Sequence, residues 1–456
     1  MVDWLTLWDK VNSGPEMEEK RFDLKIYKIA NELKKNYGIV FDVSNGFKIE
    51  KSMMRDIYDA GFNLFLEIGS YCTSNKKIIK ISEEDIKEDL KKVKEKVRAG
   101  QGKESIIIGG NKPNDRSNVI IVGGPCACPI SEEIFVTVMS TYANEPKVNA
   151  LIPGKLQKIK GKDITMRTPL EMFATREEAK LTRKATELSN RPGMPIIGIE
   201  SVSSEAANFS YGNDGLRNTD IHEIDPINEL KISFETLKRI LFCQKNNLST
   251  TTMMCPVLGG VAGGPEETAI VTVAEALQSV CIVGGDMFTF AVNNIHTGSG
   301  TDSKSLWVDL AALLALKNAL PMVVSTLIWT ASGPCTETVI LEIASKTILD
   351  IACGADAIMS AGCTKGRLLD CYTGMEATIC AEIAHSVHKN KLSLDDAAEI
   401  SLELNRGYEE KILRGELPVP KSFSECYSLD GKPKKEYLDI WNSFKSKLKD
   451  MGVCLV

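Results

Sequence analysis

Short runs of β-branched and apolar residues recur along the chain from about residue 105, and most of them end at a glycine or a proline. They alternate with segments that have helical periodicity, such as 266–279 and 337–352. The runs are almost continuously apolar, which is typical of parallel strands that are covered by helices on both faces. The seven runs lie at residues 117–125, 147–154, 194–201, 249–257, 279–286, 321–333 and 355–362.

This alternation predicts an α/β protein with a (β/α)8 TIM-type barrel, in which one strand is poorly defined by the sequence. A doubly wound open sheet is the alternative. It is disfavoured because no run leads into a G-x-G-x-x-G turn at the start of a helix. We expect an N-terminal helical segment at 1–100 packed on the barrel, the barrel itself at 101–400, and a C-terminal helical tail at 401–456.

Composition narrows the class of protein further. The net charge of −6 argues against a nucleic-acid surface, which needs a basic stripe. Thirteen cysteines, many of them inside apolar runs, are typical of a reducing compartment, so we expect a cytoplasmic protein. The N-terminus lacks the pattern of a signal peptide. The longest apolar region, 306–330, contains Asp309, Lys317 and Pro321, so we expect a buried helix and a strand rather than a membrane span.

In a barrel of this kind, catalytic groups lie at the carboxyl ends of the strands. Glu200 and Asp286 end two of the predicted strands, and Glu223 is expected in the long loop beyond Glu200. Together the three could form an anionic cavity that holds a cation. Each of them could instead cap a helix or pair with a lysine or an arginine. Trp329 ends another strand, where its ring could face a cation or pack in the core.

A second set of candidates is rich in sulfur. Cys126 and Cys128, together with Cys255, Cys335 and His296, could form a thiolate zinc site at the barrel mouth. A single C-x-C is a weak signal, and cysteines are common throughout the chain. Buried, inert thiols are the more frequent outcome, so we assign no metal site.

Seven segments taken together resemble the monomethylamine methyltransferases of methanogenic archaea. They read IVGGPCACPISEEIF, RPGMPIIG, HEIDPINELKI, GGVAGGPEETAIVTVA, GPCTE, TGMEA and SFSECY. The resemblance extends from near the N-terminus to the C-terminal helix. It implies a barrel enzyme that forms a homo-oligomer, a hexamer. It also implies that the enzyme moves the methyl group of methylamine to Co(I) of a cobalamin (corrinoid) carried by a separate protein, and that it holds no cofactor tightly itself.

The resemblance also marks one departure from the family. The strand after Arg-Pro-Gly-Met presents pyrrolysine in that family, and the matching residue here is Ile197. Met253 stands where the family has a carboxylate beside the pyrrolysine ring, and Leu327 stands where it has an amide. Glu200 and Glu223 are retained. The electrophile and two polar supports are therefore replaced together by apolar groups, which indicates a re-formed pocket.

These observations lead to one main hypothesis and two alternatives. The main hypothesis is a corrinoid-dependent methyltransferase without pyrrolysine that acts on a methylated amine, with a quaternary ammonium as the first choice. Glu223, Glu200 and Asp286 would stabilise the cation, and Trp329 would form an aromatic wall. The apolar floor would consist of Ile197, Met253 and Leu327. The alternatives are a zinc-dependent methylthiol transferase that uses the cysteines, and a non-catalytic paralogue that binds a corrinoid protein or a small ligand.

Overall fold

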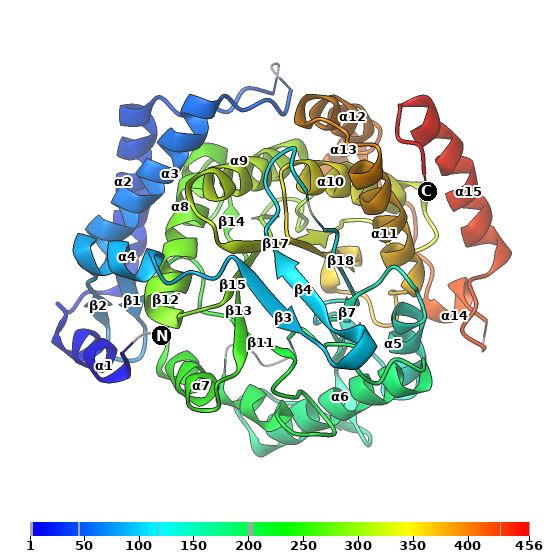
Figure 1. The fold of residues 1–456 in the computed structure, drawn as a ribbon, viewed down its shortest axis with the longest axis horizontal. Helices are drawn as coiled ribbons and strands as arrows, with labels where there is room; N and C mark the ends of the chain where they lie inside the picture. The colour runs from blue at the N-terminus through cyan, green and yellow to red at the C-terminus, as the bar shows by residue number, and fades with distance from the viewer. Residues whose placement is uncertain (1–2, 44–45, 117, 199–203, 429, 456) are drawn as a thin grey trace.

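The computed structural model describes residues 3–43, 46–116, 118–198, 204–428 and 430–455 of the chain. It confirms the α/β class, with a seven-stranded sheet at the centre in which every neighbouring pair of strands is parallel (Figure 1). In spatial order the strands are β11 (Ile221–Ile224), β13 (Ser249–Met254), β15 (Met287–Phe290), β17 (Val323–Trp329), β18 (Ala357–Gly362), β5 (Ile121–Gly123) and β7 (Ala150–Leu151).

One short segment connects the two edges of this sheet. Ile197 N–H donates to the Leu151 carbonyl on β7 at 2.7 Å, and Gly198 N–H donates to the Ile221 carbonyl on β11 at 3.0 Å. Parallel bridges accordingly join Leu151 to Ile196 and Ile197 to Ile221. The sheet therefore curls until residues 195–198 contact both of its edge strands.

Helices surround the sheet, and each of them follows one of its seven strands. They are α5 (Phe135–Ala143), α6 (Pro169–Leu188), α7 (Phe234–Lys245), α8 (Pro265–Gln278), α9 (Ser303–Ala319), α10 (Glu337–Ala352) and α11 (Gly374–Lys389). Local sequence determines where several of them begin. Ser233 caps α7 by accepting from Thr236 N–H, and α8 begins at a proline followed by two glutamates, which favour a helix N-terminus.

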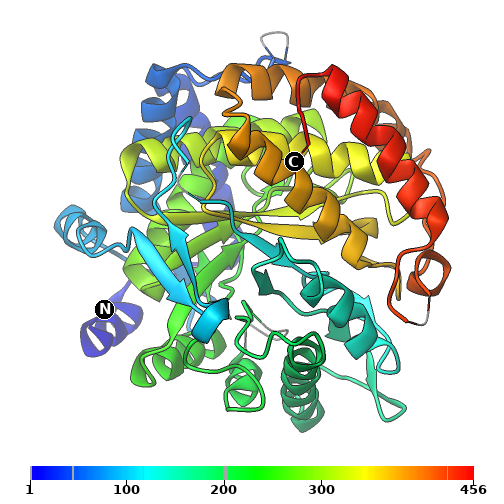
Figure 2. The same ribbon diagram turned by 45° about the vertical axis from the view of Figure 1, so that its right-hand side comes forward.

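The chain termini add outer layers on opposite sides of the sheet (Figure 1). The N-terminal helices α1 (Trp4–Ser13), α2 (Glu19–Tyr37), α3 (Lys51–Ile68) and α4 (Glu83–Leu90) lie beside α8 and α9, together with the short strands β1 (Ser70–Cys72), β2 (Lys77–Ile79) and β12 (Lys231–Ile232). The C-terminal helices are α12 (Leu394–Arg406), α13 (Glu409–Arg414), α14 (Phe423–Cys426) and α15 (Lys435–Asp450). Figure 2 shows α15 running along the outside of the molecule, where it packs against α10.

A hairpin closes the amino end of the curled sheet. Strands β3 (Lys96–Ala99) and β4 (Ile106–Gly109) pair antiparallel and lie across this end in Figure 1. Val97 and Ile108 belong to the same buried cluster as the inward-facing side chains of the sheet. A Cβ on Gly109 would come within 2.9 Å of Val323 at the start of β17. A binding site inside the sheet is therefore reached from the carboxyl ends of the strands.

One predicted strand is wrong. Residues 279–286 were expected to form a strand, but Ser279–Val283 extend α8 as a π-helical turn that ends at Gly284 in the left-handed conformation. The strand β15 begins only at Met287. A short buried run of apolar residues suits the end of a covered helix as well as a strand, so periodicity alone does not separate the two.

The remaining global expectations concern redox state and membranes. All thirteen cysteines are free thiols, in agreement with the disulfide-free chain that was predicted. Within the described residues, no helix combines the length and the apolar character that crossing a membrane requires.

Candidate active site

The three residues that were predicted to form an apolar floor lie together inside the sheet. Ile197 and Leu327 are buried members of one apolar cluster, and Met253 packs against it while remaining partly exposed. They come from the bridging segment, β17 and β13, and each points inward because alternate residues of a strand face the same side. Trp329 packs against the same cluster. The structure thus brings together the residues that were predicted to form the apolar floor.

A buried ion pair holds the segment that carries Ile197. Arg183 of α6 and Asp220, which precedes β11, are both 2% exposed, and their side chains lie 2.5 Å apart. Asp220 also accepts the backbone N–H of Ile196 at 2.9 Å, and Arg183 donates to the carbonyl of Met194 at 2.8 Å. These two hydrogen bonds hold the backbone on either side of Pro195, and further bonds from the pair to Gly215 and Arg217 tie it to the loop that leads into β11. The network therefore determines where the Ile197 side chain enters the interior.

Glu223 lies directly beside this segment. It is the third residue of β11, it is 3% exposed, and it shares the inward face of the strand with Ile221. A Cβ on Gly198 would come within 2.0 Å of Glu223 Oε2, and Gly198 has a φ of +77°. Only glycine combines this backbone conformation with the space that the carboxylate occupies. The carboxylate is therefore held against the backbone that follows Ile197.

Asp225 is a second acidic residue of the site, and the sequence analysis did not single it out. It lies two residues after Glu223, and both carboxylates act on the thiols of Cys126 and Cys255. Burial raises the pKa of each thiol, and the charges of Asp225 and Glu223 raise it further. These cysteines are therefore neutral thiols. The signal for Asp225 was present in the motif His-Glu-Ile-Asp, whose spacing of two places both acids on one face of an extended strand.

One guanidinium lies behind the two acids. Arg239 of α7 is buried and donates to Asn208 Oδ1 at 3.0 Å and to the backbone carbonyl of Glu223 at 3.5 Å. Burial lowers the pKa of Arg239, and nearby groups that include Glu223 and Asp225 oppose that shift. Arg239 therefore places a fixed cation next to β11, where it contacts the backbone of Glu223.

His222 points to the opposite side of β11 from Glu223, because neighbouring residues of a strand face opposite sides. Its Nε2 lies 3.0 Å from the Arg217 carbonyl, and its ring meets Tyr211 edge to face. Burial lowers the pKa of His222 to about 3, and the charge of Arg239 adds to that effect. The imidazole is therefore neutral and structural.

Trp329 closes the other side of the apolar cluster. A bulge between β17 and β18 places it opposite Gly362, and its backbone carbonyl accepts from Gly300 N–H at 2.9 Å. A Cβ on Gly362 or Gly366 would come within 2.4 or 2.5 Å of the indole ring, so both positions must lack a side chain. The ring orientation is fixed by these two backbone contacts.

One of the predicted acidic residues, Asp286, does not join this group. Asp286 precedes β15 and therefore lies at the amino end of the sheet, where it pairs with Lys94 at 2.7 Å and accepts from Thr250 N–H at 3.1 Å. Its placement at a carboxyl end was wrong because the preceding run is a π-helical turn. Glu200 falls outside the described residues.

The zinc hypothesis finds no ligand set. In the described part of the chain, which includes Cys126, Cys128, Cys255, Cys335 and His296, no three His, Cys, Asp or Glu side chains converge on a point that could hold a metal ion. Cys126 and Cys128 are instead buried near Trp329 and Tyr372.

Comparison with known proteins gives the family. The family model described as "Monomethylamine methyltransferase MtmB" matches residues 2–453. The chain belongs to the MtmB family. MtmB1 of Methanosarcina barkeri is 30% identical over 457 residues, which cover 99% of this chain and 98% of the relative. MtmB1 of Methanosarcina acetivorans is 30% identical over 454 residues, with the same two shares covered.

Solved structures extend the likeness to three dimensions. The crystal structure of Methanosarcina barkeri MtmB superposes with a TM-score of 0.94 at 30% identity, covering 99% of this chain and 98% of that one. The hydroxylamine complex of MtmB gives the same TM-score. The MtmB fold therefore includes the N-terminal layer and the C-terminal helices as well as the sheet. The predicted membership of an enzyme family, the methylamine methyltransferases, is confirmed.

Proposed function

We propose that this MtmB-family chain moves a methyl group from a quaternary ammonium to Co(I) of a separate corrinoid protein, without pyrrolysine. The family match supports methyl transfer from a methylated amine. The observation that carries the finer proposal is the contact cluster of Ile197, Met253 and Leu327 beside Glu223. Ile197 stands where the resemblance places pyrrolysine, and the two polar supports expected around that residue are apolar as well.

We propose that substrate enters this site at the carboxyl ends of the strands. We interpret residues 195–198 as the eighth strand of a (β/α)8 barrel, because they hydrogen-bond to both edge strands. The hairpin β3–β4 covers the amino end of the interior. This arrangement favours access from the carboxyl ends of the strands, where such barrels bind their substrates.

The lining favours a fully methylated cation over methylamine. A primary ammonium carries three N–H donors, and each needs an acceptor when it leaves water. Ile197 and Leu327 offer none through their side chains, and Met253 offers only a weak sulfur acceptor. A quaternary ammonium has methyl groups in place of donors, so it loses no hydrogen bonds against this floor. Glu223 and Asp225 supply negative charge to hold it, and Trp329 supplies an aromatic ring of the kind that binds such cations.

The reaction balances without a nucleophile from this chain. The carbon–nitrogen bond breaks and its electron pair stays on nitrogen, so the amine leaves neutral. The carbon–cobalt bond forms with the electron pair that Co(I) supplies. Because the positive charge disappears during transfer, the carboxylates bind the substrate rather than the transition state. The contribution of the protein to the rate is then positioning of the methyl group for in-line attack.

The partner must reach the same entrance, and exposed apolar side chains are found there. They are Phe209, Ile227, Ile295, Leu368 and Leu369, on loops that follow the bridging segment and strands β11, β15 and β18. Exposed apolar groups of this kind favour a protein interface. We propose that the corrinoid protein docks on these loops. We also retain from the resemblance a homo-oligomer, a hexamer, which measurement of the mass in solution tests. The cytoplasmic location that the free cysteines favour stays part of the proposal.

The deciding experiment mixes the purified full-length protein with corrinoid proteins held in the Co(I) state. Monomethylamine, trimethylamine, tetramethylammonium and glycine betaine are added separately, and methylation of the corrinoid is followed by its visible absorbance. We expect methylation with a quaternary ammonium and none with monomethylamine. Methylation by monomethylamine alone would overturn the choice of substrate. No methylation with any compound, although one of them binds, would favour a non-catalytic binding paralogue.

A further inference from the structure

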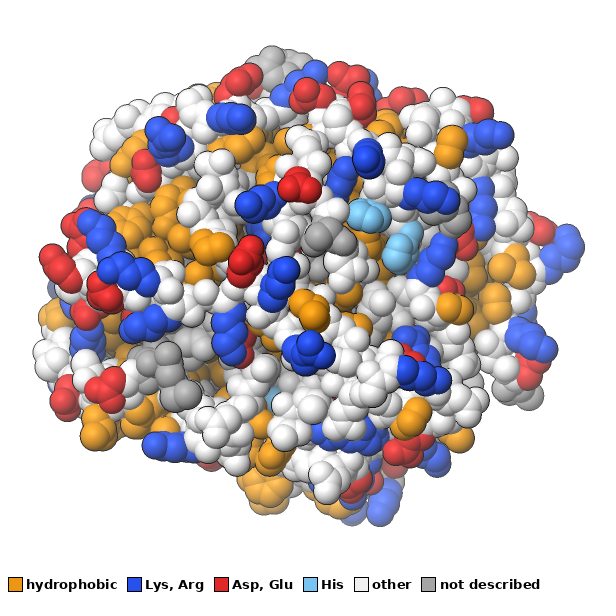
Figure 3. Space-filling view, viewed as in Figure 1, with side chains coloured by type: hydrophobic (Ala, Val, Ile, Leu, Met, Phe, Trp, Pro, Cys, Tyr) orange, Lys and Arg blue, Asp and Glu red, His pale blue; other side chains and the backbone are white. Residues whose placement is uncertain are grey.

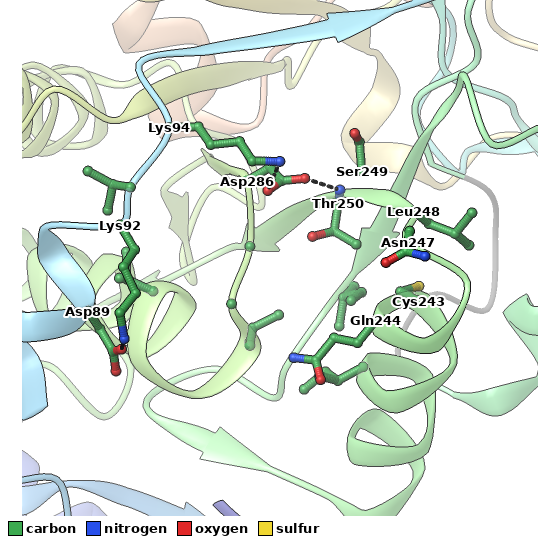
Figure 4. A pocket seen from close by; sticks show the side chains of 17 residues that line it. Asp89, Lys92, Lys94, Cys243, Gln244, Asn247, Leu248, Ser249, Thr250 and Asp286 are labelled. Carbon is green, nitrogen blue, oxygen red and sulfur yellow. Dashed lines mark hydrogen bonds and ion pairs between the residues drawn. The ribbon is translucent and has the colours of Figure 1, made fainter. Parts of the chain in front are cut away.

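A cavity lies at the amino end of the sheet, opposite the carboxyl ends where we place the methyl-transfer site. Its volume is about 320 Å³, which is in the range of small-molecule sites. It is formed between the end of α4, the C-terminal half of α7 and the residues that precede β13 and β15 (Figure 4). The residues that form it are remote in sequence and are all described.

The inner wall of this cavity is apolar. Ile224, Ile240 and Leu248 line it from the side of β11, α7 and the start of β13, and Val280 and Val283 line it from the π-helical turn. A π turn inserts an extra residue into a helix and is often found at functional sites. Here it brings two valines to the wall and leads into Gly284 and Gly285, which also line the cavity. The wall offers burial to an aliphatic group.

The outer wall carries both signs of charge. Lys92 pairs with Asp89 at 2.8 Å, and Lys94 pairs with Asp286 at 2.7 Å. The lysine side chains are each 53% exposed, whereas Asp89 and Asp286 are 20% and 15% exposed. Figure 4 shows these pairs at the edge of the cavity, with Gln244 reaching in from α7.

Neutral polar groups complete this edge. Asn247, Ser249 and Thr250 line the side of the cavity that leads into β13. Gln244 Nε2 is a buried donor with no hydrogen-bond partner. A buried donor without an acceptor is costly, so a ligand oxygen that accepted from it would be stabilised.

The two ion pairs restrict the charge of a ligand. A simple anion that bound a lysine would displace an aspartate and leave it mostly buried without its ion-pair partner. A simple cation would displace a half-exposed lysine, which costs less. A zwitterion can satisfy both residues of a pair. Its carboxylate takes the place of the aspartate beside the lysine, and its ammonium group takes the place of the lysine beside the aspartate. The wider face around this cavity has blue and red side chains interspersed, without a large patch of one sign (Figure 3).

We propose that this cavity binds a small zwitterion with an aliphatic side chain, the chemical class of the neutral amino acids. The carboxylate of the ligand contacts Lys94 and the amide of Gln244, its ammonium group contacts Asp286, and its aliphatic chain packs against Leu248, Val280 and Val283. This site is separate from the proposed methyl-transfer site and does not depend on its chemistry.

Binding is tested on the full-length protein with three matched probes. L-leucine has both charges, 4-methylpentanoate lacks the ammonium, and 3-methylbutylamine lacks the carboxylate. Titration calorimetry and saturation-transfer NMR measure their affinities, and a crystal soak locates the bound molecule. We expect leucine to bind at least tenfold more tightly than either single ion. Equal binding of the three probes, no binding of leucine, or leucine bound elsewhere would overturn the proposal.

Substitutions at the cavity wall distinguish leucine binding in this cavity from nonspecific binding elsewhere on the protein. Lys94→Met removes one charge at the cavity wall and should weaken leucine binding at least tenfold. Lys91→Met is the matched control, because Lys91 pairs with Glu88 on the surface and does not line the cavity. Asp286→Asn keeps an acceptor for Thr250 N–H but loses the negative charge, so it should weaken leucine without unfolding the protein. Unchanged affinity in both Lys94→Met and Asp286→Asn would contradict the proposal, whatever the methyl-transfer assay shows.

Discussion

Glu223 occupies the space that a side chain at position 198 would need, since a Cβ on Gly198 would come within 2.0 Å of Glu223 Oε2. This contact links the residue after the bridging segment to the carboxylate that we assign to the substrate cation. The backbone of Gly198, with a φ of +77°, and the position of Glu223 are therefore set together.

Gly198→Ala should accordingly displace Glu223 and lower methyl transfer at least tenfold. It should also cost about 1–2 kcal/mol of stability, because alanine disfavours a positive φ. Thermal unfolding and the rate of corrinoid methylation measure the two effects. Gly415→Ala is the matched control, because Gly415 has a φ of +70° and nothing within 4 Å of its Cβ position. If both variants lose the same stability and neither loses activity, the contact does not matter for function.

Removing the charge of Glu223 should weaken binding of a trimethylammonium probe. Choline and its neutral analogue 3,3-dimethylbutan-1-ol differ at one atom that carries the charge, so comparing them isolates electrostatics. Glu223→Gln should raise the Kd for choline about tenfold, or ~1.4 kcal/mol, and leave the neutral analogue unchanged. Asp225→Asn should have a smaller effect, because Asp225 is more exposed to water. Asp286→Asn should have none, since Asp286 lies at the other end of the sheet.

Trp329→Leu should also weaken the binding of choline more than the binding of its neutral analogue. A cation over an aromatic ring gains roughly 0.5–2 kcal/mol, which corresponds to a rise in Kd of about 2- to 30-fold. Trp329→Phe keeps an aromatic ring at this position, so its affinity for choline should lie between that of the parent and that of Trp329→Leu. Calorimetry on the three proteins gives the affinities. A loss that is equal for choline and the neutral alcohol would assign Trp329 to packing alone.

Much of the fold and part of the site were predictable from the sequence for a physical reason. A parallel sheet buried on both faces requires apolar runs that alternate with helices, and this pattern was visible in the strands that became β5, β13 and β17. The inward-facing floor residues Ile197 and Leu327 followed from the resemblance, and the structure brings them together.

Other features depend on contacts that no local pattern encodes. Residues 279–286 were predicted as a strand because a buried π turn and a buried strand have the same composition. Because of that error, Asp286 was predicted at the carboxyl end of a strand, whereas it lies at the amino end of the sheet. The contact between Gly198 and Glu223 joins residues 25 positions apart across two neighbouring strands, so it depends on strand register. Asp225 was within reach, because its spacing of two from Glu223 is a strand pattern that the analysis left unused.

Acid should destabilise the protein through His222. Burial lowers the pKa of His222 to about 3 from 6.5, so below pH 6.5 the unfolded chain takes up a proton that the folded protein does not. The free energy of unfolding therefore falls as the pH decreases from about 6.5 toward 3, by up to ~1.4 kcal/mol per pH unit from this residue. Above pH 6.5 it contributes no pH dependence.

His222→Phe removes this titration while keeping a ring against Tyr211. The variant should be less stable than the parent at pH 7.5, because the contact of Nε2 with the Arg217 carbonyl is lost. The difference should shrink as the pH is lowered to 4.5. Urea unfolding at several pH values measures it, with His296→Gln as the control at an exposed histidine. A constant difference across this range would contradict the assignment of a neutral, buried His222.

Breaking the buried ion pair behind the bridging segment should be the most destabilising of these changes. Arg183→Met leaves Asp220 buried without its cation and removes a donor to the Met194 carbonyl, so we expect a loss of about 3–5 kcal/mol. Arg414→Ala is the control, because its pair with Glu410 is exposed and worth less than about 1 kcal/mol. Arg183→Lys keeps the charge but not the two directed donors, so it should restore part of the stability and less of the methyl-transfer rate. Restoration of both to the same degree would show that Arg183 stabilises the fold without positioning Ile197.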